Sequence, residues 1–316
     1  MSRRLSALDA LGRGAGNLRG NLELVWIQLA GSLALVAVVL VGVLAMFAAF
    51  GLPASLLAAD RPEALREALE ALPDDLSSLP RRFGSALLVL LVTSTVAFLA
   101  FCWYQAGTLA VLVAGEAQAP VARGATGAVF RTFSWSAFFG WSTRYFLRLF
   151  WLLNLFLLFM LLALLGLLLP LLLLPSLAEA RGGGAACLVG CGAALPFLFV
   201  LSAVAIAMTV AQVRVVEEPC GVFAAARSGF AIAGRRLGAL VLLYVLMLVA
   251  SLAVALLFGG LGVTAELALA GSAWKALPAV ALSILQMVAG AALSLLYLAA
   301  VVALVRAERR LEAAPA

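Results

Sequence analysis

Six long runs of apolar residues constrain this chain more than any other feature of its sequence. They cover approximately residues 24–52, 85–114, 146–175, 185–214, 237–262 and 277–305. A helix needs about 20 mostly apolar residues to cross the hydrocarbon core of a bilayer, and these runs reach or exceed that length. Only 11% of the residues are charged, whereas soluble domains carry roughly 25%. We therefore predict an all-α polytopic membrane protein with six transmembrane helices.

The positive charges indicate how these helices are oriented. Fifteen of the 21 Lys and Arg residues lie in the N-terminal arm, the second and fourth connections and the C-terminal end, on one side of the predicted topology. Cytoplasmic loops carry an excess of Lys and Arg, so we expect both termini in the cytoplasm. The net charge of +6 is then a signal of topology and requires no nucleic acid.

The connections on this side suggest a threefold repeat. A basic segment of about twenty residues precedes each odd-numbered run. We predict three hairpins of spans, each preceded by a cytoplasmic-side amphipathic interfacial helix, in a single integral membrane domain of residues 1–316. The repeat units are approximately 1–115, 116–215 and 216–306, followed by a cytoplasmic tail at 307–316.

Each basic segment carries apolar residues at helical spacing. The three stripes are Leu8, Leu11, Ala15, Leu18 and Leu22; Phe130, Phe133, Ala137, Trp141 and Tyr145; and Val222, Ala226, Phe230 and Leu237. A helix with an apolar stripe and a basic edge lies flat in the membrane interface, with its stripe among acyl chains. We therefore expect a collar of residues in contact with anionic lipid headgroups: Arg13, Arg19, Arg131, Arg144, Arg227, Ser228, Arg235 and Arg236. Topology alone also places basic residues beside spans, so the alternative is a flanking charge without a specific ligand.

The third segment resembles a known sequence element. The stretch "VVEEPCGVFAAARSGFAIAGRRLGALVLL" is similar to the recurring element of the membrane domain attached to some bacterial glycerophosphodiester phosphodiesterases. It also resembles the six-span YciC-type inner-membrane proteins of unknown function. The residues that carry the resemblance are Glu217 or Glu218, Gly221, Ala224 to Ala226, Arg227, Ser228, Arg235 and Arg236. The resemblance implies a multi-pass protein of the bacterial inner membrane. The related enzymes have a soluble domain with catalytic histidines, whereas this chain has no His, so phosphodiesterase activity is not expected.

No set of residues in the sequence predicts a reaction. The chain has no His, which removes the commonest metal ligand and the usual general base. We expect no catalytic residues, no metal and no cofactor. The pair Cys187 and Cys191 lies one helical turn apart without an accompanying His or carboxylate, and small-residue packing is the interpretation that we favour.

Three functions remain open at this point. The first is a non-enzymatic protein that engages anionic lipid headgroups in membrane-lipid or envelope maintenance. The second is a transporter or channel for a small neutral or amphiphilic solute, with Gln105, Asn154, Gln212 and Gln286 as a polar path, because a buried amide needs a partner. The third is a membrane anchor for a soluble partner. Residues 53–84 are expected to form an outer loop with a short amphipathic helix, and the sequence leaves open a homo-oligomer or an unidentified protein partner.

Overall fold

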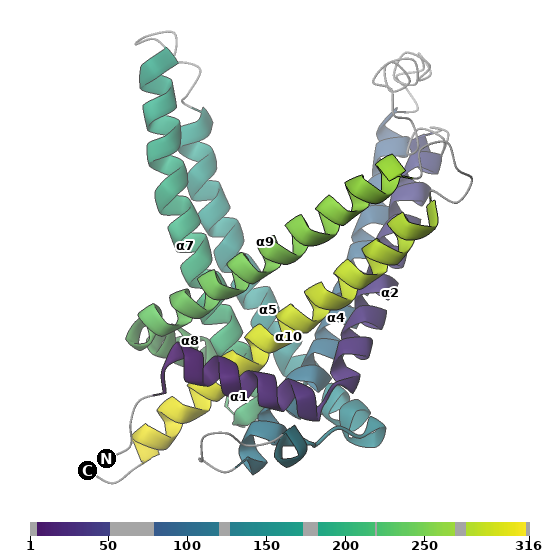
Figure 1. Cartoon of the computed structure of the whole chain (residues 1–316). Coiled ribbons are helices and arrows are strands. Elements are labelled where there is room, and N and C mark those ends of the chain that lie inside the picture. Colours follow the sequence, from purple (N-terminus) through teal and green to yellow (C-terminus); the bar gives the residue numbers. More distant parts are fainter. Residues whose placement is uncertain are drawn as a thin grey trace. The chain divides into compact units, whose positions relative to one another are not determined.

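Six long apolar helices dominate the computed structural model of this chain (Figure 1). The residues that the structure describes are 5–50, 79–119, 127–172, 183–218, 220–268 and 276–313. The long helices are α2 (Glu23–Phe50), α4 (Leu79–Gln118), α5 (Trp135–Leu172), α7 (Gly183–Glu217), α9 (Leu237–Ala268) and α10 (Ala276–Ala313). Each contains a segment long and apolar enough to cross a membrane. Over the described residues, the structure therefore confirms the predictions of an all-helical chain and of six helices able to span a membrane.

Two short helices lead into the first and fifth of these spans. They are α1 (Ala7–Gly20) and α8 (Val222–Arg235), and each has 14 residues. The Ser6 hydroxyl caps α1 by accepting a hydrogen bond from the backbone N–H of Asp9 at 3.1 Å, which satisfies one of the free donors of the first turn. Asn21 directly follows the last residue of α1, and Arg236 directly follows the last residue of α8; each is the C-terminal capping residue of its helix. The first and third predicted segments thus form separate helices.

The second predicted segment does not form a separate helix. It contains a short 3-10 helix, η2 (Gly127–Phe130), four irregular residues, and then α5, which runs from Trp135 to Leu172 without a break. No proline lies between Trp135 and the apolar run, so nothing there removes the backbone donors that continue a helix. The aromatic part of the segment is therefore the first part of a spanning helix.

The chain divides into two compact units. One comprises residues 27–104, which include most of α2 and the first part of α4. Within this unit, a Cβ atom added to Gly42 of α2 would lie 2.6 Å from Thr93 Oγ1 of α4. Small residues at such contacts let the backbones of two spanning helices approach closely.

The other unit comprises residues 1–26 and 105–316 and has α10 at its centre. Helix α10 packs against α9 and α7, and α5 packs against α7. Residues Ala299–Val305 of α10 are all buried, although a spanning helix bordered by lipid would expose one face. Neighbouring protein therefore surrounds this stretch of α10.

The short helices α1 and α8 pack against spanning helices through small residues. Gly14 of α1 lies against the backbone of α10, where an added Cβ would be 2.7 Å from Ala300 N, and Gly229 of α8 lies equally close to Ala207 O of α7. Figure 1 shows α1 lying across α10. The expectation that each apolar stripe would lie wholly among acyl chains is therefore wrong for Leu18 and Ala226, which are buried against protein.

The second segment packs in a comparable way on the spanning helix that precedes it. Thr132 Oγ1 donates to the carbonyl oxygen of Val111 in α4 at 3.0 Å, and a Cβ on Gly115 of α4 would lie 2.8 Å from Phe130 O. Thus α8 packs on α7, the second segment on α4, and α1 on α10, the last span. The three leading segments and the last parts of the three even-numbered spans consequently meet at one end of this unit.

Two predicted elements fall partly or wholly outside the described residues. The outer loop expected at 53–84 overlaps the undescribed residues 51–78, and its last residues belong to α4. The tail expected at 307–316 is helical as far as residue 313, because α10 ends at Ala313. The side chains of Cys187 and Cys191 lie outside the description, although both residues belong to α7.

Candidate functional site

Two of the arginines predicted to contact headgroups lie inside the protein instead. Arg13 Nη2 of α1 is 2.7 Å from Glu116 Oε1 of α4, and the two side chains are only 13% and 2% exposed. Arg236 Nη2 is 2.5 Å from Glu308 Oε2 of α10, and both side chains are 9% exposed. The prediction that Arg13 and Arg236 form part of a lipid-facing collar is therefore wrong, because a buried carboxylate already holds each guanidinium.

Three further members of the predicted collar have protein partners at or near the surface. Arg131 pairs with Glu23 at 3.2 Å, and Arg235 pairs with Glu312 at 2.7 Å, with all four side chains exposed to solvent or lipid. The hydroxyl of Ser228 accepts a hydrogen bond from Arg214 Nε at 3.0 Å, so Ser228 supports an internal arginine. Arg131 and Arg235 remain accessible, but their charges are compensated.

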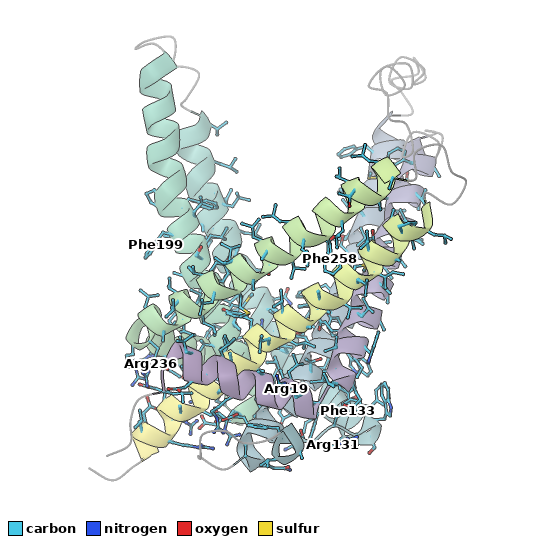
Figure 2. The ribbon with its side chains drawn as sticks, viewed as in Figure 1. Arg19, Arg131, Phe133, Phe199, Arg236 and Phe258 are labelled. Atoms are coloured by element: carbon cyan, nitrogen blue, oxygen red, sulfur yellow. The ribbon has the colours of Figure 1, made fainter. Side chains whose placement is uncertain are left out.

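A different group of arginines is exposed without a carboxylate partner. Arg19, Arg144 and Arg227, which the sequence predicted, belong to it, as do Arg148 and Arg310, which the sequence analysis did not select. Within the part of the chain that the structure describes, none of these five side chains forms an ion pair; the Arg144 guanidinium lies over the Tyr145 ring at 5.6 Å from its centroid. We call these five residues the exposed arginines. Figure 2 shows Arg19 at the same end of its compact unit as Arg131 and Arg236.

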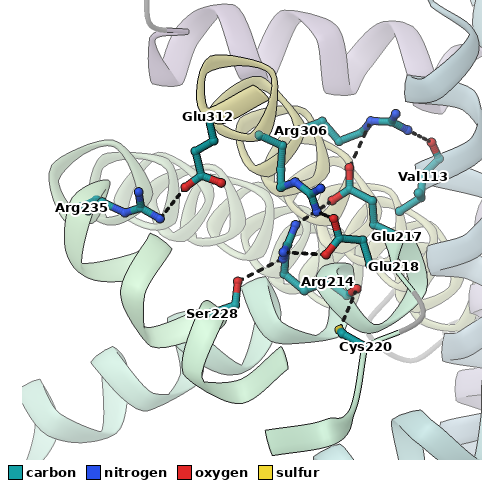
Figure 3. A network of polar contacts seen from close by, with 10 residues as sticks. Val113, Arg214, Glu217, Glu218, Cys220, Ser228, Arg235, Arg306 and Glu312 are labelled. Carbon is teal, nitrogen blue, oxygen red and sulfur yellow. Dashed lines mark hydrogen bonds and ion pairs between the residues drawn. The ribbon is translucent and has the colours of Figure 1, made fainter. Parts of the chain in front are cut away.

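A cluster of charged residues connects the ends of α7 and α10 (Figure 3). Arg214 of α7 binds Glu218 at 2.8 Å and lies 3.6 Å from Glu217. From α10, Arg306 approaches Glu217 at 3.5 Å, and Arg309 pairs with Glu218. Each carboxylate is therefore shared by arginines from two helices. We call these five residues the α7–α10 cluster.

Arg306 extends this cluster to a third spanning helix. Its Nη1 donates to the carbonyl oxygen of Val113 in α4 at 2.8 Å. That carbonyl lies in the last two turns of α4, and a hydrogen bond from a charged donor to a backbone oxygen is stronger than one from a neutral donor. Arg306 thus fixes the end of α10 against the ends of both α4 and α7.

A buried or nearly buried glutamate ends each even-numbered span. These terminal glutamates are Glu116 of α4, Glu217 of α7 and Glu308 of α10, and each binds an arginine from another helix: Arg13, Arg306 and Arg236, respectively. Glu116 and Glu308 were not selected from the sequence, and Glu217 was selected only as a residue of the resemblance. Their common position at the end of an even-numbered apolar run was the signal that could have identified them.

A second set of missed residues holds α1 against the second segment. Asn21 is fully buried; its Nδ2 donates to Phe130 O at 2.8 Å, and its Oδ1 accepts from the backbone N–H groups of Thr132 and Phe133 at 3.0 and 2.9 Å. One turn earlier, buried Asn17 donates from Nδ2 to Leu112 O of α4 at 2.8 Å. Asn21 therefore supplies the backbone hydrogen bonds that the irregular segment around residues 130–133 lacks, and Asn17 joins α1 to α4.

Replacing Asn21 with alanine is expected to loosen the second segment. The change leaves the buried Phe130 carbonyl and two backbone N–H groups without their partner, and each such group costs about 1–3 kcal/mol. Hydrogen exchange measured by mass spectrometry should show faster exchange at residues 130–133. Asn154→Ala is a suitable control, because Asn154 donates only to Phe150 O in its own helix; equal exchange at residues 130–133 in wild type and Asn21→Ala would contradict this role of Asn21.

The four amides predicted to form a polar path lie in different environments. Gln212 is buried, Gln105 and Asn154 are half-buried, and Gln286 is exposed. Asn154 Nδ2 donates to Phe150 O at 2.8 Å. Across the described ranges, no hydrogen bond joins one of these four residues to another, so the structure does not bring them together as a site.

Two cysteines have described side chains, and they belong to different units. Cys220 Sγ lies 3.8 Å from Arg214 O, beside the α7–α10 cluster, and Cys102 is buried. The arrangement as a whole is a set of interhelical ion pairs surrounded by exposed arginines. Comparison with protein-family models, with curated proteins and with solved structures finds no match to this chain.

Proposed function

We propose that this chain is a non-enzymatic membrane protein whose exposed arginines engage the headgroups of anionic lipids. A guanidinium group is always charged and presents several donors in a planar fork that suits phosphate oxygens. Such a group near an anionic leaflet contributes roughly 1 kcal/mol of attraction. The residues assigned to this role are Arg19, Arg144, Arg148, Arg227 and Arg310.

The observation that carries this proposal concerns the charged residues at this end of the molecule: the glutamates are paired, whereas the exposed arginines are not. Six glutamates of the described residues lie there, and each is ion-paired with an arginine; they are Glu23, Glu116, Glu217, Glu218, Glu308 and Glu312. The exposed arginines have no such compensation. A surface with uncompensated positive charge attracts anions, and beside a membrane the most abundant anions are lipid phosphates.

Exposed apolar side chains support a position of this end at the membrane boundary. Leu8 of α1 is 65% exposed and Phe223 of α8 is 78% exposed, and both helices lie outside the six spanning segments. Trp26 and Trp135, at the starts of α2 and α5, are exposed as well. Tryptophan is enriched at the headgroup level, and an interfacial helix combines such residues with arginine. Because Lys and Arg gather on this side of the predicted topology, we assign this end to the cytoplasmic leaflet.

The proposed physiological role follows from the resemblance of residues 217–236 to the membrane domain of the phosphodiesterases and to YciC-type proteins. On that basis the chain acts in the bacterial inner membrane as a scaffold or lipid handler in membrane-lipid or envelope maintenance. Its partners are then membrane lipids with anionic headgroups.

The lipids that remain bound after gentle solubilisation test this proposal. A variant with Arg19→Gln, Arg148→Gln and Arg227→Gln is expected to lose its enrichment of phosphatidylglycerol over phosphatidylethanolamine, as measured by native mass spectrometry. The corresponding Lys variant is the matched control and should retain the enrichment, because it keeps the three charges. An unchanged lipid ratio in the Gln variant would exclude headgroup binding by these residues.

A further inference from the structure

An apolar groove of about 340 Å³ lies between the spanning helices α7 and α9. Sites for small molecules have volumes of roughly 300–1,000 Å³ and combine mostly apolar walls with a few polar groups. The groove fits this description, because none of its described lining residues carries a charge and only Ser202 and Tyr244 carry a hydroxyl group. The residues that line it are Leu198, Phe199, Ser202, Ala203 and Ile206 of α7, and Leu237, Val241 and Tyr244 of α9.

The two hydroxyl groups belong to opposite walls of the groove. Within the part of the chain that the structure describes, neither Ser202 nor Tyr244 forms a side-chain hydrogen bond. The neighbouring hydroxyls are satisfied inside the protein: Thr209 Oγ1 donates to Ala205 O at 3.0 Å, and Tyr297 is hydrogen-bonded to Thr209. The Tyr297 ring lies edge-on to that of Tyr244. A hydroxyl group in hydrocarbon is unfavourable without a partner, so a ligand with polar oxygen atoms would complete Ser202 and Tyr244.

The position of the groove requires that such a ligand be uncharged. Its walls belong to the candidate spans Pro196–Glu217 and Leu237–Ala265. From Leu237 to Tyr244 a helix rises roughly 10 Å at 1.5 Å per residue, which is about a third of the roughly 30 Å hydrocarbon core. A charge at such a depth is far costlier than a neutral polar group unless an opposite charge accompanies it, and no described lining residue supplies one. Hydroxyl or ester oxygens suit the groove, whereas a phosphate does not.

The groove is open to the surrounding bilayer. Phe199 and Tyr244 are 66% and 44% exposed, and Figure 2 shows Phe199 on α7. Interfaces between spanning helices favour small residues that let backbones approach closely, whereas Leu198 and Phe199 at the exposed edge of the groove are bulky. A flexible lipid that enters from the bilayer therefore suits this groove better than a helix of a second copy.

We infer that the groove between α7 and α9 binds an uncharged lipid of the diacylglycerol class. Its acyl chain packs against Phe199 and Val241, and its hydroxyl or ester oxygens form hydrogen bonds with Ser202 and Tyr244. The site uses none of the exposed arginines and takes a ligand without charge, so the inference goes beyond the proposed function. The chain then binds two classes of lipid, one by its headgroup at the membrane boundary and one between the spanning helices.

Photo-crosslinking with defined lipids tests this site. The full chain is reconstituted in phosphatidylcholine vesicles that contain a small fraction of a diacylglycerol with a diazirine in one acyl chain, and crosslinked residues are identified by mass spectrometry. We expect several-fold stronger labelling of Leu198, Phe199 and Val241 than of Leu256, an exposed residue of α9 outside the groove. Phosphatidylcholine and phosphatidylglycerol with the same diazirine chain should not show this preference. Equal preference for all three probes would overturn the selection of an uncharged lipid.

Two conservative substitutions test the hydroxyl groups. Tyr244→Phe and Ser202→Ala each remove one hydroxyl and keep nearly the same shape, so each should reduce the labelling of the groove by diacylglycerol several-fold in a folded protein. Ser251→Ala is the matched control, because Ser251 is an exposed residue of α9 outside the groove, and it should leave the labelling unchanged. Unchanged labelling in both Tyr244→Phe and Ser202→Ala would overturn the inference.

The exposed arginines provide the test of independence from the proposed function. The variant with Arg19→Gln, Arg148→Gln and Arg227→Gln should keep the labelling of the groove by diacylglycerol, because no arginine lines the groove among the described residues. Loss of this labelling in that variant would contradict a separate neutral site. Failure of the proposed function appears in a different measurement, the enrichment of phosphatidylglycerol, so the two proposals can fail separately.

Discussion

Replacing Glu308 with alanine is expected to lower the free energy of unfolding by about 3–5 kcal/mol. The substitution leaves the Arg236 guanidinium, which is only 9% exposed, without its carboxylate at 2.5 Å. Removing one partner of a buried ion pair costs about this much, because the remaining charge has neither water nor a counter-charge around it. Denaturant or thermal unfolding in mild detergent, followed by circular dichroism, measures the effect.

The neighbouring pair on the same two helices provides a matched control. Arg235 and Glu312 are 52% and 42% exposed, so Glu312→Ala should change the same free energy by less than about 1 kcal/mol. A double variant, Arg236→Met with Glu308→Leu, should recover most of the stability lost in Glu308→Ala, because it removes both charges and keeps the apolar volume. Equal losses for Glu308→Ala and Glu312→Ala would contradict the buried role of Glu308.

Gly229→Ala is expected to destabilise the protein by about 1–3 kcal/mol, which is the usual cost of overpacking. The added Cβ would lie 2.7 Å from Ala207 O and 2.8 Å from Ala211 Cβ. Backbone and a methyl group cannot move aside as the end of a flexible side chain can, so α8 must shift away from α7. The midpoint of thermal unfolding should fall, and hydrogen exchange in α8 should increase.

The control for this substitution lies in the same short helix. Gly234 has no neighbouring heavy atom within 4 Å of an added Cβ. Because alanine has a higher helix propensity than glycine by up to about 1 kcal/mol, Gly234→Ala should leave stability unchanged or increase it slightly. Opposite signs for the two substitutions are the expected result, and a loss of similar size in both would argue against close packing at Gly229.

The spanning helices could be predicted because the membrane leaves few alternatives. A backbone in hydrocarbon must satisfy its own hydrogen bonds, and a long apolar run such as residues 237–262 therefore predicts a helix directly. The observed α9 (Leu237–Ala268) begins at the predicted residue. The start of α5 was predicted less accurately, because polar residues such as Ser136 and Arg144 in its first turns resemble a separate interfacial segment.

The partners of the charged residues could not be predicted in this way. Arg13 and Arg19 both lie on the first short helix and both look like residues that face lipid headgroups. Only the tertiary arrangement brings Glu116, which lies 103 positions after Arg13, to the first of them and leaves the second exposed. Similarly, Leu8 and Leu18 have the same apolar character, but only Leu18 of the two is buried. Sequence periodicity identifies the amphipathic helix, whereas the choice of its buried face depends on which neighbour it meets.

The contact between Gly14 and Ala300 has a consequence for the order in which the protein assembles during translation. A ribosome that adds roughly 5–20 residues per second synthesises these two residues roughly 15–60 s apart. The first helix emerges long before its binding surface on α10 exists, whereas α8 emerges directly after α7, on which it packs. The N-terminal arm can therefore bind α4 and the second segment soon after they emerge, whereas its contact with α10 must wait until that helix has been inserted.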